Sequence, residues 1–459
     1  MLLKEHNYIV AQSMEEFTPQ VLQRVIQAHK MHQVSRLRKL YNYYVGKNQT
    51  ILNRTFNDSS KPNNKITNNF SKLITEQITS MFIANPVKYT SEDKEALLEL
   101  QIINEINQEK HHNYILAKNA SIFGASYELL YMDERAEVRY AILPSEEVIP
   151  VYTAGLGNDT LVGAVRYYTI ESLSDQANDL DVVEVYDAYT VKTYNATGGA
   201  MKLVNEVPHY FRQVPINVYQ ANDDQLGDSE GVLALIDAYD SALSNTANTF
   251  DYFSDAYLVL TNALDSNPEE FAQMSQDRIL LLPENGNAEF LAKQIDSASL
   301  DSYMNKLKEN IFKFSYIVDL ENSSFGNDVS GVALRYRLQM LESVCSSRER
   351  LFSQAITKRN QMIFNILAVK GKQYNANNIN MTFTRNIPAS LAEEATIAQQ
   401  LTGIVSKETI LEMLSVVEDV QGELERMNNE QMGMEALVNP YPIPSLEDDD
   451  DLDEVPPME

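Results

Sequence analysis

The chain has 459 residues, enough for about three domains of ordinary size, and 44% of its residues are hydrophobic, which excludes a wholly disordered protein. Its 65 acidic residues outnumber 37 basic ones, for a net charge of −28. Such a chain is a poor candidate for coating its surface with nucleic acid, because counterion release needs Lys and Arg in excess. The single cysteine, Cys345, excludes a disulfide framework and any zinc or iron–sulfur site built from several cysteines.

Charge is unevenly distributed along the chain. The segment 17–57 has no acidic residue and seven basic ones, so it is able to contact an anionic partner. The segment 228–330 holds 18 acidic and five basic residues. The segment 445–459 holds eight acidic residues and no basic one, which predicts a disordered tail. The N-terminus shows no secretory leader pattern and no run of about 18 apolar residues occurs, so we expect neither secretion nor a membrane span.

The first part of the chain predicts helices. A helix is expected over about 19–46, with Thr18 as N-cap and Pro19 as first helical residue. A second is expected over about 66–84, and two more over 92–122, ending at Gly124.

After Gly124 the residue pattern changes from that of helices to that of strands. Runs rich in Val, Tyr, Ile and Thr, separated by turn-forming clusters, predict an antiparallel sheet region inserted between helical parts. The expected strands are 126–130, 138–143, 161–170, 182–194 and 204–214.

Two apolar seams with a spacing of four and three follow, and they predict two long helices that pack along those seams. The first seam is Val232, Ile236, Tyr239, Leu243, Thr246, Phe250, Phe253, Tyr257 and Leu260, and the second is Leu300, Met304, Leu307, Ile311, Phe314 and Val318. Between them lies a module of about 264–296 with an expected strand over Arg278–Leu282. An ordinary helical bundle would show the same periodicity.

A polar loop over 319–330 precedes a third seam. That seam consists of Leu334, Leu338, Leu341, Cys345, Arg348, Phe352, Ala355, Met362 and Ile366. It predicts a helix over 331–370, roughly 60 Å long at 1.5 Å per residue.

Motifs for catalysis are weak. No Gly-x-x-x-x-Gly-Lys-Ser/Thr occurs, so we expect any ATP hydrolysis to come from a partner. His29 and His32 share a helix face without a nearby carboxylate, and of the adjacent His111 and His112 we expect one to be solvated and the other packed. Glu92-Asp93-Lys94 is typical of a helix first turn. We therefore expect no catalytic residues, no metal site and no cofactor.

Several blocks, in this order along the chain, resemble one family. They are Tyr41-Asn-Tyr-Tyr-Val-Gly46, Pro62-Asn-Asn-Lys-Ile-Thr-Asn-Asn69, Ala84-Asn-Pro-Val-Lys-Tyr89, Gly124-Ala-Ser-Tyr-Glu-Leu-Leu-Tyr131, Pro144-Ser-Glu-Glu-Val-Ile-Pro-Val-Tyr152, Leu235-Ile-Asp-Ala-Tyr-Asp240, Asp255-Ala-Tyr-Leu-Val259, Ser330-Gly-Val-Ala-Leu334, Phe383-Thr-Arg-Asn-Ile-Pro388 and Gly403-Ile-Val-Ser-Lys-Glu-Thr409. Over about residues 35–430 the chain resembles the phage portal proteins typified by that of the Bacillus phage SPP1.

The resemblance implies a mixed α+β, predominantly helical portal fold, assembled as a ring of usually twelve copies at one capsid vertex. Its parts would be a wing (1–225), a first stem helix (226–263), a clip (264–296), a second stem helix (297–318), a tunnel loop (319–330), a long wing helix with a following strand (331–388), a crown (389–435) and the acidic tail (436–459).

The resemblance also implies site residues and partners. The tunnel loop facing DNA would be Asn322, Ser323, Ser324, Phe325, Gly326, Asn327, Asp328 and Val329. The stem seam would be Ile236, Tyr239, Leu243, Phe250, Phe253, Tyr257, Met304, Leu307, Ile311 and Phe314. The partners would be further copies of the chain, double-stranded DNA in the channel, terminase, head-completion or adaptor proteins, and major capsid and scaffolding proteins, with no membrane. The location would be the virion, preceded by the host cytoplasm during assembly.

The acidic segment 228–330 fits this function for a physical reason. A channel wall that bound phosphates tightly would stall a sliding duplex, whereas a negative wall repels the duplex toward the axis. The alternative is that these acidic side chains only solvate the outer helix faces. A phage-encoded nuclease or other DNA-processing enzyme with a helical assembly domain is the alternative function, and it would show metal-dependent DNA cleavage instead of rings.

Overall fold

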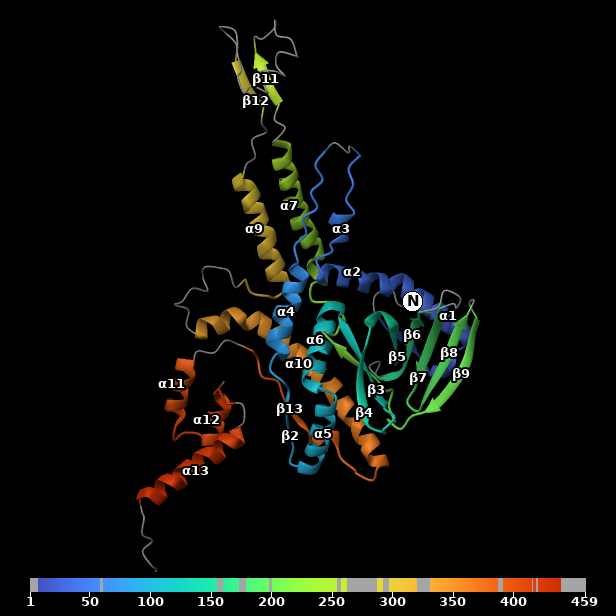
Figure 1. Ribbon diagram of the computed structural model, residues 1–459, viewed down its shortest axis with the longest axis vertical. Helices are drawn as coiled ribbons and strands as arrows, with labels where there is room; N and C mark the ends of the chain where they lie inside the picture. Colours follow the sequence, from blue (N-terminus) through green and yellow to red (C-terminus); the bar gives the residue numbers. More distant parts are fainter. Residues whose placement is uncertain are drawn as a thin grey trace, which may run out of the picture. The chain divides into compact units, whose positions relative to one another are not determined.

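The computed structural model describes residues 7–57, 61–154, 160–172, 179–197, 200–253, 257–261, 287–291, 297–319, 331–386, 391–414, 416–417 and 420–438. The described residues form a mixed, helix-rich fold, as the sequence predicts (Figure 1). The chain divides into two units, one of residues 1–327 with 335–386 and the other of residues 328–334 with 387–459.

The N-terminal helix of the first unit is continuous but not uniform. It consists of α1 (Pro19–His29), a π-helical turn η2 (Lys30–Val34) and α2 (Ser35–Tyr44). The side chain of Thr18 accepts a hydrogen bond from the backbone N–H of Val21, so the predicted N-cap is confirmed. The π turn was not predicted.

Four further helices follow, and all but the first, a four-residue helix, were predicted within a few residues. They are α3 (Gln49–Leu52), α4 (Phe70–Ile83), α5 (Lys94–Ile106) and α6 (Glu109–Phe123). Gly124 ends α6 with a φ of 89° in the left-handed region, which glycine adopts without strain.

The largest sheet has six strands in the order β1-β5-β6-β7-β8-β9. Their bounds are β1 (Ile9–Ala11), β5 (Val148–Thr153), β6 (Leu161–Ile170), β7 (Leu180–Tyr186), β8 (Thr190–Thr197) and β9 (Ala200–Pro208). The pairing is antiparallel except between β1 and β5, which are parallel. The apolar face of this sheet packs against α1 in a core that includes Leu22, Val25, Val165 and Val183.

Two predicted strand ranges were wrong in their bounds. The range 182–194 is two strands, because the carboxylate of Asp187 accepts hydrogen bonds from the backbone N–H groups of Tyr189 and Thr190 and turns the chain. The range 204–214 covers only the end of β9. Arg212, with a φ of 57°, interrupts the extended conformation before β10 (Ile216–Gln220).

Three smaller sheets occur among the described residues, and two of them contain strands from residues 88–220. Strands β10, β3 (Ala125–Met132) and β4 (Val138–Leu143) form a three-stranded antiparallel sheet. Strand β13 (Asn380–Thr382) pairs antiparallel with β2 (Lys88–Thr90).

The long helix α10 (Gly331–Val369) has 39 residues, in agreement with the predicted range. Every seam position whose side chain is described is buried, namely Leu338, Leu341, Cys345, Arg348, Phe352, Ala355, Met362 and Ile366. The ring of Phe82 lies between Phe352 and Phe383, at centroid distances of 5.1 and 5.5 Å. This apolar contact joins α4, α10 and the chain before residue 387.

The second unit contains three helices within the described residues. They are α11 (Leu391–Leu401), α12 (Lys407–Met413) and α13 (Val420–Val438), and α12 contacts both of the others. The side chain of Ser406 caps α12 by accepting from the backbone N–H of Thr409.

Four predictions lie outside the described residues. They are the loop residues Asn322–Val329, the strand Arg278–Leu282, most of the module 264–296, and the tail from residue 439 onward. Within the described part of the chain, no helix is long and apolar enough to cross a membrane.

Candidate functional site

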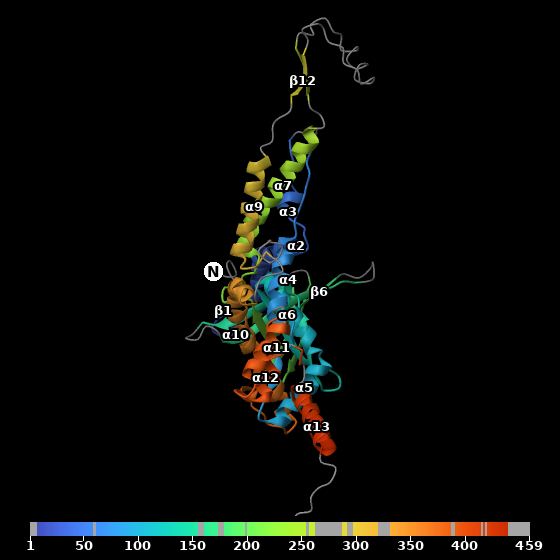
Figure 2. The same cartoon turned by 90° about the vertical axis from the view of Figure 1, so that its left-hand side faces the viewer.

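The two predicted seam helices form a pair that we call the stem. Helix α7 (Leu233–Phe253) follows a short 3-10 turn, η4 (Glu230–Val232), and runs side by side with α9 (Ser297–Phe314) in the opposite direction (Figures 1 and 2). Strands β11 (Tyr257–Thr261) and β12 (Asn287–Leu291) pair antiparallel at the end of the stem that is remote from the sheets (Figure 1).

The seam residues differ in exposure, and the most exposed of those described lie near the C-terminal end of each stem helix. Ile236, Leu307 and Ile311 are buried, and Tyr239, Leu243 and Met304 are half-buried. Phe250 is 62% exposed and Phe314 is 57% exposed. The side chain of Phe253 lies outside the described residues, although its backbone ends α7. The single chain therefore covers only part of the seam.

Three half-buried aromatic rings pack together where α4 meets the stem. The ring of Phe70, at the start of α4, meets Tyr239 edge-on at 5.1 Å and Phe312 at 6.4 Å. Phe70 and Phe312 were absent from the predicted seam, because periodicity within one helix does not identify the residues that another helix contributes.

The prediction that Tyr257 and Leu260 continue the helical seam was wrong. Both lie in β11, four or more residues after α7 ends. The run Tyr-Leu-Val-Leu-Thr over 257–261 is apolar or β-branched at every position, so it fits the apolar spacing of a helix as well as that of a strand. Its residues favour strands, and they pair with β12.

A polar face of α7 is held by an extended segment, residues 62–69, that we call the strap. The backbone N–H of Asn64 donates to Oδ1 of Asn248 (2.6 Å), and its side chain donates to Asp251 (2.5 Å). The backbone N–H of Ile66 donates to Oγ of Ser244 (2.9 Å), which donates back to the carbonyl of Ile66 (3.3 Å).

The strap and the helix match in length. Two residues of extended chain advance about 6.6 Å, and four residues of α-helix advance about 6.0 Å. Strap positions 64, 66 and 68 therefore meet helix positions 248, 244 and 240 in turn, with the two chains antiparallel. The strap thus fixes the position of α7 along its own axis.

Two carboxylates anchor the lower end of this polar face. Asp240 is fully buried, and its oxygens accept from the backbone and side-chain nitrogens of Asn68 and from the side chain of Asn48. Burial raises the pKa of Asp240, against the lowering effect of these hydrogen bonds. Asp237 accepts from Asn48 (2.9 Å) and from the hydroxyl of Tyr43 (2.6 Å).

Residues 227–230, just before the stem, pack closely against α6 and α2, and we call them the joint. Gly227 lies against α6, where an added Cβ would come within 2.4 Å of the carbonyl oxygen of Ile122. The backbone N–H of Asp228 donates to the carbonyl of Ser121 (2.8 Å). Glu230 accepts two hydrogen bonds from the guanidinium of Arg36, at 2.6 and 2.5 Å.

A buried ion pair ties this joint to α10. Nη2 of Arg348 lies 2.6 Å from Oδ1 of Asp228, and the two side chains are 0% and 6% exposed. The other oxygen of Asp228 accepts from the hydroxyl of Ser121. Removing one partner of such a pair costs about 3 to 5 kcal/mol, because it leaves an unpaired buried charge.

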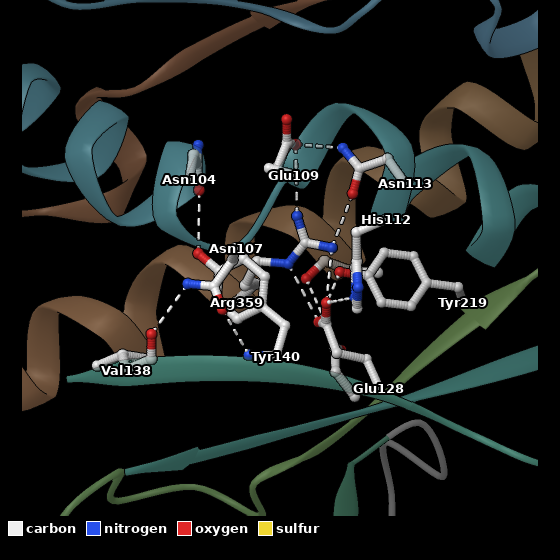
Figure 3. Close-up of polar contacts among 12 residues, drawn as sticks. Asn104, Asn107, Glu109, His112, Asn113, Glu128, Val138, Tyr140, Tyr219 and Arg359 are labelled. Atoms are coloured by element: carbon white, nitrogen blue, oxygen red, sulfur yellow. Dashed lines mark hydrogen bonds and ion pairs between the residues drawn. The ribbon is translucent and has the colours of Figure 1, made fainter. Parts of the chain in front are cut away.

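A second buried network lies where α10 crosses the three-stranded sheet (Figure 3). Nη2 of Arg359 lies 2.7 Å from Glu128, which also accepts from Tyr219 (2.9 Å) and contacts Nε2 of His112 (2.8 Å). Glu109 lies 3.5 Å from Nη1 of Arg359. Burial alone would raise the pKa of Glu128, but Arg359 and His112 lower it to about 2. This network holds α6, β3, β10 and α10 together.

The histidines have structural surroundings. His112 is buried and His111 is exposed, which confirms that one of the pair is packed. His29 is buried between the hydroxyl of Tyr167 (2.7 Å) and the side chain of Asn7 (2.6 Å), and burial lowers its pKa to about 4. Among the described residues, no group of three or more His, Cys, Asp or Glu side chains is placed to hold a metal ion.

Sequence reasoning missed the polar half of this site. Its signal was present in the spacing of Asp237, Asp240, Ser244, Asn248 and Asp251, which repeat by three and four beside the apolar seam. The second signal is the Asn-rich run 62–69, whose backbone and side-chain amides are able to donate to such a polar helix face.

Comparison with known proteins gives a consistent result. The family model described as "Phage portal protein, SPP1 Gp6-like" matches residues 23–434. A portal protein of Bacillus phage SPP1 is 27% identical over 444 residues, covering 92% of this chain and 85% of that protein. A portal protein of Clostridium phage phiCD119 is 24% identical over 425 residues, covering 86% and 92%.

A solved structure described as the neck of an empty GTA particle is similar at 14% identity and a TM-score of 0.47, covering 74% of this chain and 88% of that chain. The family match spans far more than half of the sequence. The chain therefore belongs to the SPP1 Gp6-like family of phage portal proteins.

Proposed function

We propose that copies of this chain assemble into a ring, usually of twelve, whose channel conducts double-stranded DNA during packaging and ejection at one capsid vertex. The observation that carries the proposal is the exposure of large aromatic side chains on both stem helices in the single chain. Phe250, Tyr303 and Phe314 are 62%, 51% and 57% exposed. An exposed apolar surface of this kind gains free energy when a neighbouring copy covers it.

The parts of the ring follow the elements. The stem of α7 and α9 would surround the channel, and the pair β11 and β12 would begin the clip that docks terminase and later head-completion proteins. The six-stranded sheet with α1 and α2 would belong to the wing, and α11 to α13 to the crown.

Negative charge supports a channel of low friction. The segment 228–330 carries 18 acidic and five basic residues, so its charge repels a duplex from the wall. Asp240, however, accepts from the strap, and Asp237 accepts from Asn48 and Tyr43, so both carboxylates are engaged within the chain. The repulsive charge would therefore come from other members of the segment, such as Asp301 and Glu309, which are exposed on α9.

The loop 319–330 would converge on the axis from every copy. Only Asp319 is described, and it pairs with Lys308 at 3.2 Å. We propose that Phe325 pins this loop to a neighbouring copy, since an apolar side chain gains more by burial than by contact with a hydrated duplex. Phe325→Ala should spare ring assembly and lower the amount of DNA packaged per capsid.

The experiment for the ring is direct. Purified protein imaged by electron microscopy should show rings with a central hole, and native mass spectrometry should give the number of copies. A stable monomer at micromolar concentration across several salt conditions would contradict the proposal. The family is structural, and no described feature favours the nuclease alternative, which metal-dependent DNA cleavage by the purified protein would reveal.

A further inference from the structure

The segment 17–57, with seven basic residues and no acidic one, has no part in the proposed channel. Four of its basic side chains lie exposed on the helix formed by α1, η2 and α2, namely Arg24, Lys30, Arg38 and Lys39. In a chain with a net charge of −28, an acid-free exposed helix face is a marked local reversal of charge.

Two adjoining hollows lie along this helix, with volumes of about 330 and 710 Å³, and both are lined by Lys30, Val34 and Arg38. The smaller hollow is also lined by Lys39, by the neutral hydrogen-bonding side chains of Ser35, Asn42, Gln49 and Thr50, and by Tyr43, which is buried. Three cations therefore line this hollow without any carboxylate. We call it the basic hollow.

The π turn explains why two of the cations share the hollow. In a regular α-helix, residues 30 and 38 would point about 80° apart. The wider turn over Lys30–Val34 takes up additional chain and changes this phase, and both side chains line the same two hollows. Turns of this kind occur frequently at functional sites.

The larger hollow is lined by Glu146, Glu147 and Asp181, and each of these carboxylates has a partner. Glu147 pairs with Arg166 at 3.3 Å, and Asp181 accepts a hydrogen bond from the hydroxyl of Thr169 at 2.6 Å. Arg38 pairs with Glu146 at 3.0 Å, although its side chain stays 69% exposed.

Asp237 is not a lining residue of the basic hollow, and it accepts from the hydroxyls of Tyr43 and Thr50, which are. The ammonium groups of Lys30 and Lys39 lie over the rings of Tyr167 and Tyr43, and neither pairs with a carboxylate among the described residues. The hollow therefore retains positive charge.

We propose that the basic hollow binds phosphate groups of the duplex DNA backbone, outside the channel. Lys30 and Lys39 are about 13 Å apart along the helix, a distance over which about four phosphates of one strand follow each other. Cations and neutral donors without an exposed stacking ring recognise backbone and not bases, so binding is independent of DNA sequence. This inference rests on the proposed function, which brings DNA to the ring, and repetition in each copy would multiply a weak contact.

The test measures binding of the full-length protein to a labelled duplex by fluorescence anisotropy, between about 50 and 200 mM salt. The double variant Lys30→Glu/Lys39→Glu should bind more weakly, and its slope of log K against log salt should fall by about 1.8, because two phosphate contacts are lost. Its melting temperature should be unchanged, since both side chains are exposed.

A matched variant controls for the added negative charge. Lys94→Glu/Lys110→Glu changes the net charge equally at exposed positions in the first turns of α5 and α6, where Glu is tolerated. This variant should keep the wild-type slope. Equal slopes for wild type and the Lys30/Lys39 variant would overturn the proposal.

Two further measurements identify the ligand. Excess inorganic polyphosphate should compete with the duplex if phosphate is the recognised group. Cross-linking of Lys39 to residues 445–459, with DNA affinity unchanged in the Lys30/Lys39 variant, would assign the hollow to the acidic tail and overturn the DNA proposal. Electron microscopy of the wild-type protein separates the two hypotheses. A lack of rings contradicts the proposed function, whereas the salt slopes report on the basic hollow whether or not rings form.

Discussion

Asn68 holds the carboxylate of Asp240 with two donors, its backbone nitrogen at 3.0 Å and its side-chain nitrogen at 2.8 Å, both to Oδ1. Asn48 donates to the other oxygen at 2.9 Å. Because Asp240 is fully buried, water cannot replace these bonds, and the strap and α7 have to fold in one register.

Asp240→Ala should therefore destabilise the protein strongly. Three donors would lose their acceptor inside the protein, which we expect to lower the free energy of unfolding by about 2 to 4 kcal/mol in urea denaturation. Asp237→Ala is the matched control. It also removes an acceptor of three hydrogen bonds, but at a half-buried site where water can replace them, so its loss should be about 1 kcal/mol. Equal losses would show that burial does not set the strength of this anchor.

The apolar seam of α10 could be predicted from the sequence, and the strap could not. The apolar seam of α10 was predictable because one helix carries the whole repeat, and even Arg348, at a seam position, is buried as the pattern requires. The strap was not predictable, because it depends on the equal advance of two different backbone conformations. No period within either segment reports that match.

The π turn and the end of α7 are two other features that helix propensity and periodicity do not predict. An extra residue in the turn Lys30–Val34 leaves the composition of a helix unchanged, so propensity does not reveal it. Phe253 ends α7 within a seam that continues in sequence, since the strand pairing of β11 with β12 overrides the helical period.

Phe250→Ser/Phe314→Ser should impair assembly and leave the fold of the single chain intact. Both side chains are more than half exposed, so they contribute little to the stability of the monomer. If a neighbouring copy covers them in a ring, their removal shifts the equilibrium toward free chains, which sedimentation velocity would detect as a loss of the large species.

Ile311→Ala is the corresponding control from the buried seam. Ile311 is 0% exposed, and truncation should cost about 2 to 5 kcal/mol of stability through the cavity left behind. We expect a lowered melting temperature for this variant and an unchanged one for the double phenylalanine variant. Normal sedimentation of the phenylalanine variant would show that these rings do not lie at an interface.

Gly227→Ala should destabilise the joint at the start of the stem. The new Cβ would lie 2.4 Å from the carbonyl oxygen of Ile122, so the backbone of α6 or of the joint has to move. Gly231→Ala is the control four residues later, because nothing lies within 4 Å of its added Cβ. This second variant should be neutral or more stable by about 0.4 to 1 kcal/mol, through a less flexible unfolded chain. Thermal unfolding of both variants decides the point, and an equal response would mean that the close contact at Gly227 is easily relieved.

Glu128→Gln should lower stability at pH 7 by about 3 to 5 kcal/mol, because Arg359 would lose its main buried partner. Arg359 and His112 hold the pKa of Glu128 at about 2, below the ordinary value of 4.5. A lowered pKa means that the stabilising contribution is complete above about pH 4.5 and disappears as the pH falls toward 2. The difference in unfolding free energy between wild type and Glu128→Gln should therefore shrink by as much as about 3 kcal/mol over that range.

Glu137→Gln is the control, because it removes a more exposed partner of Arg139. Its unfolding free energy should differ little from that of wild type, and the difference should not change with pH. Urea unfolding at pH 7, about 4 and about 3 compares the two variants, and a constant difference for Glu128→Gln would show that its carboxylate gains nothing from the buried arginine.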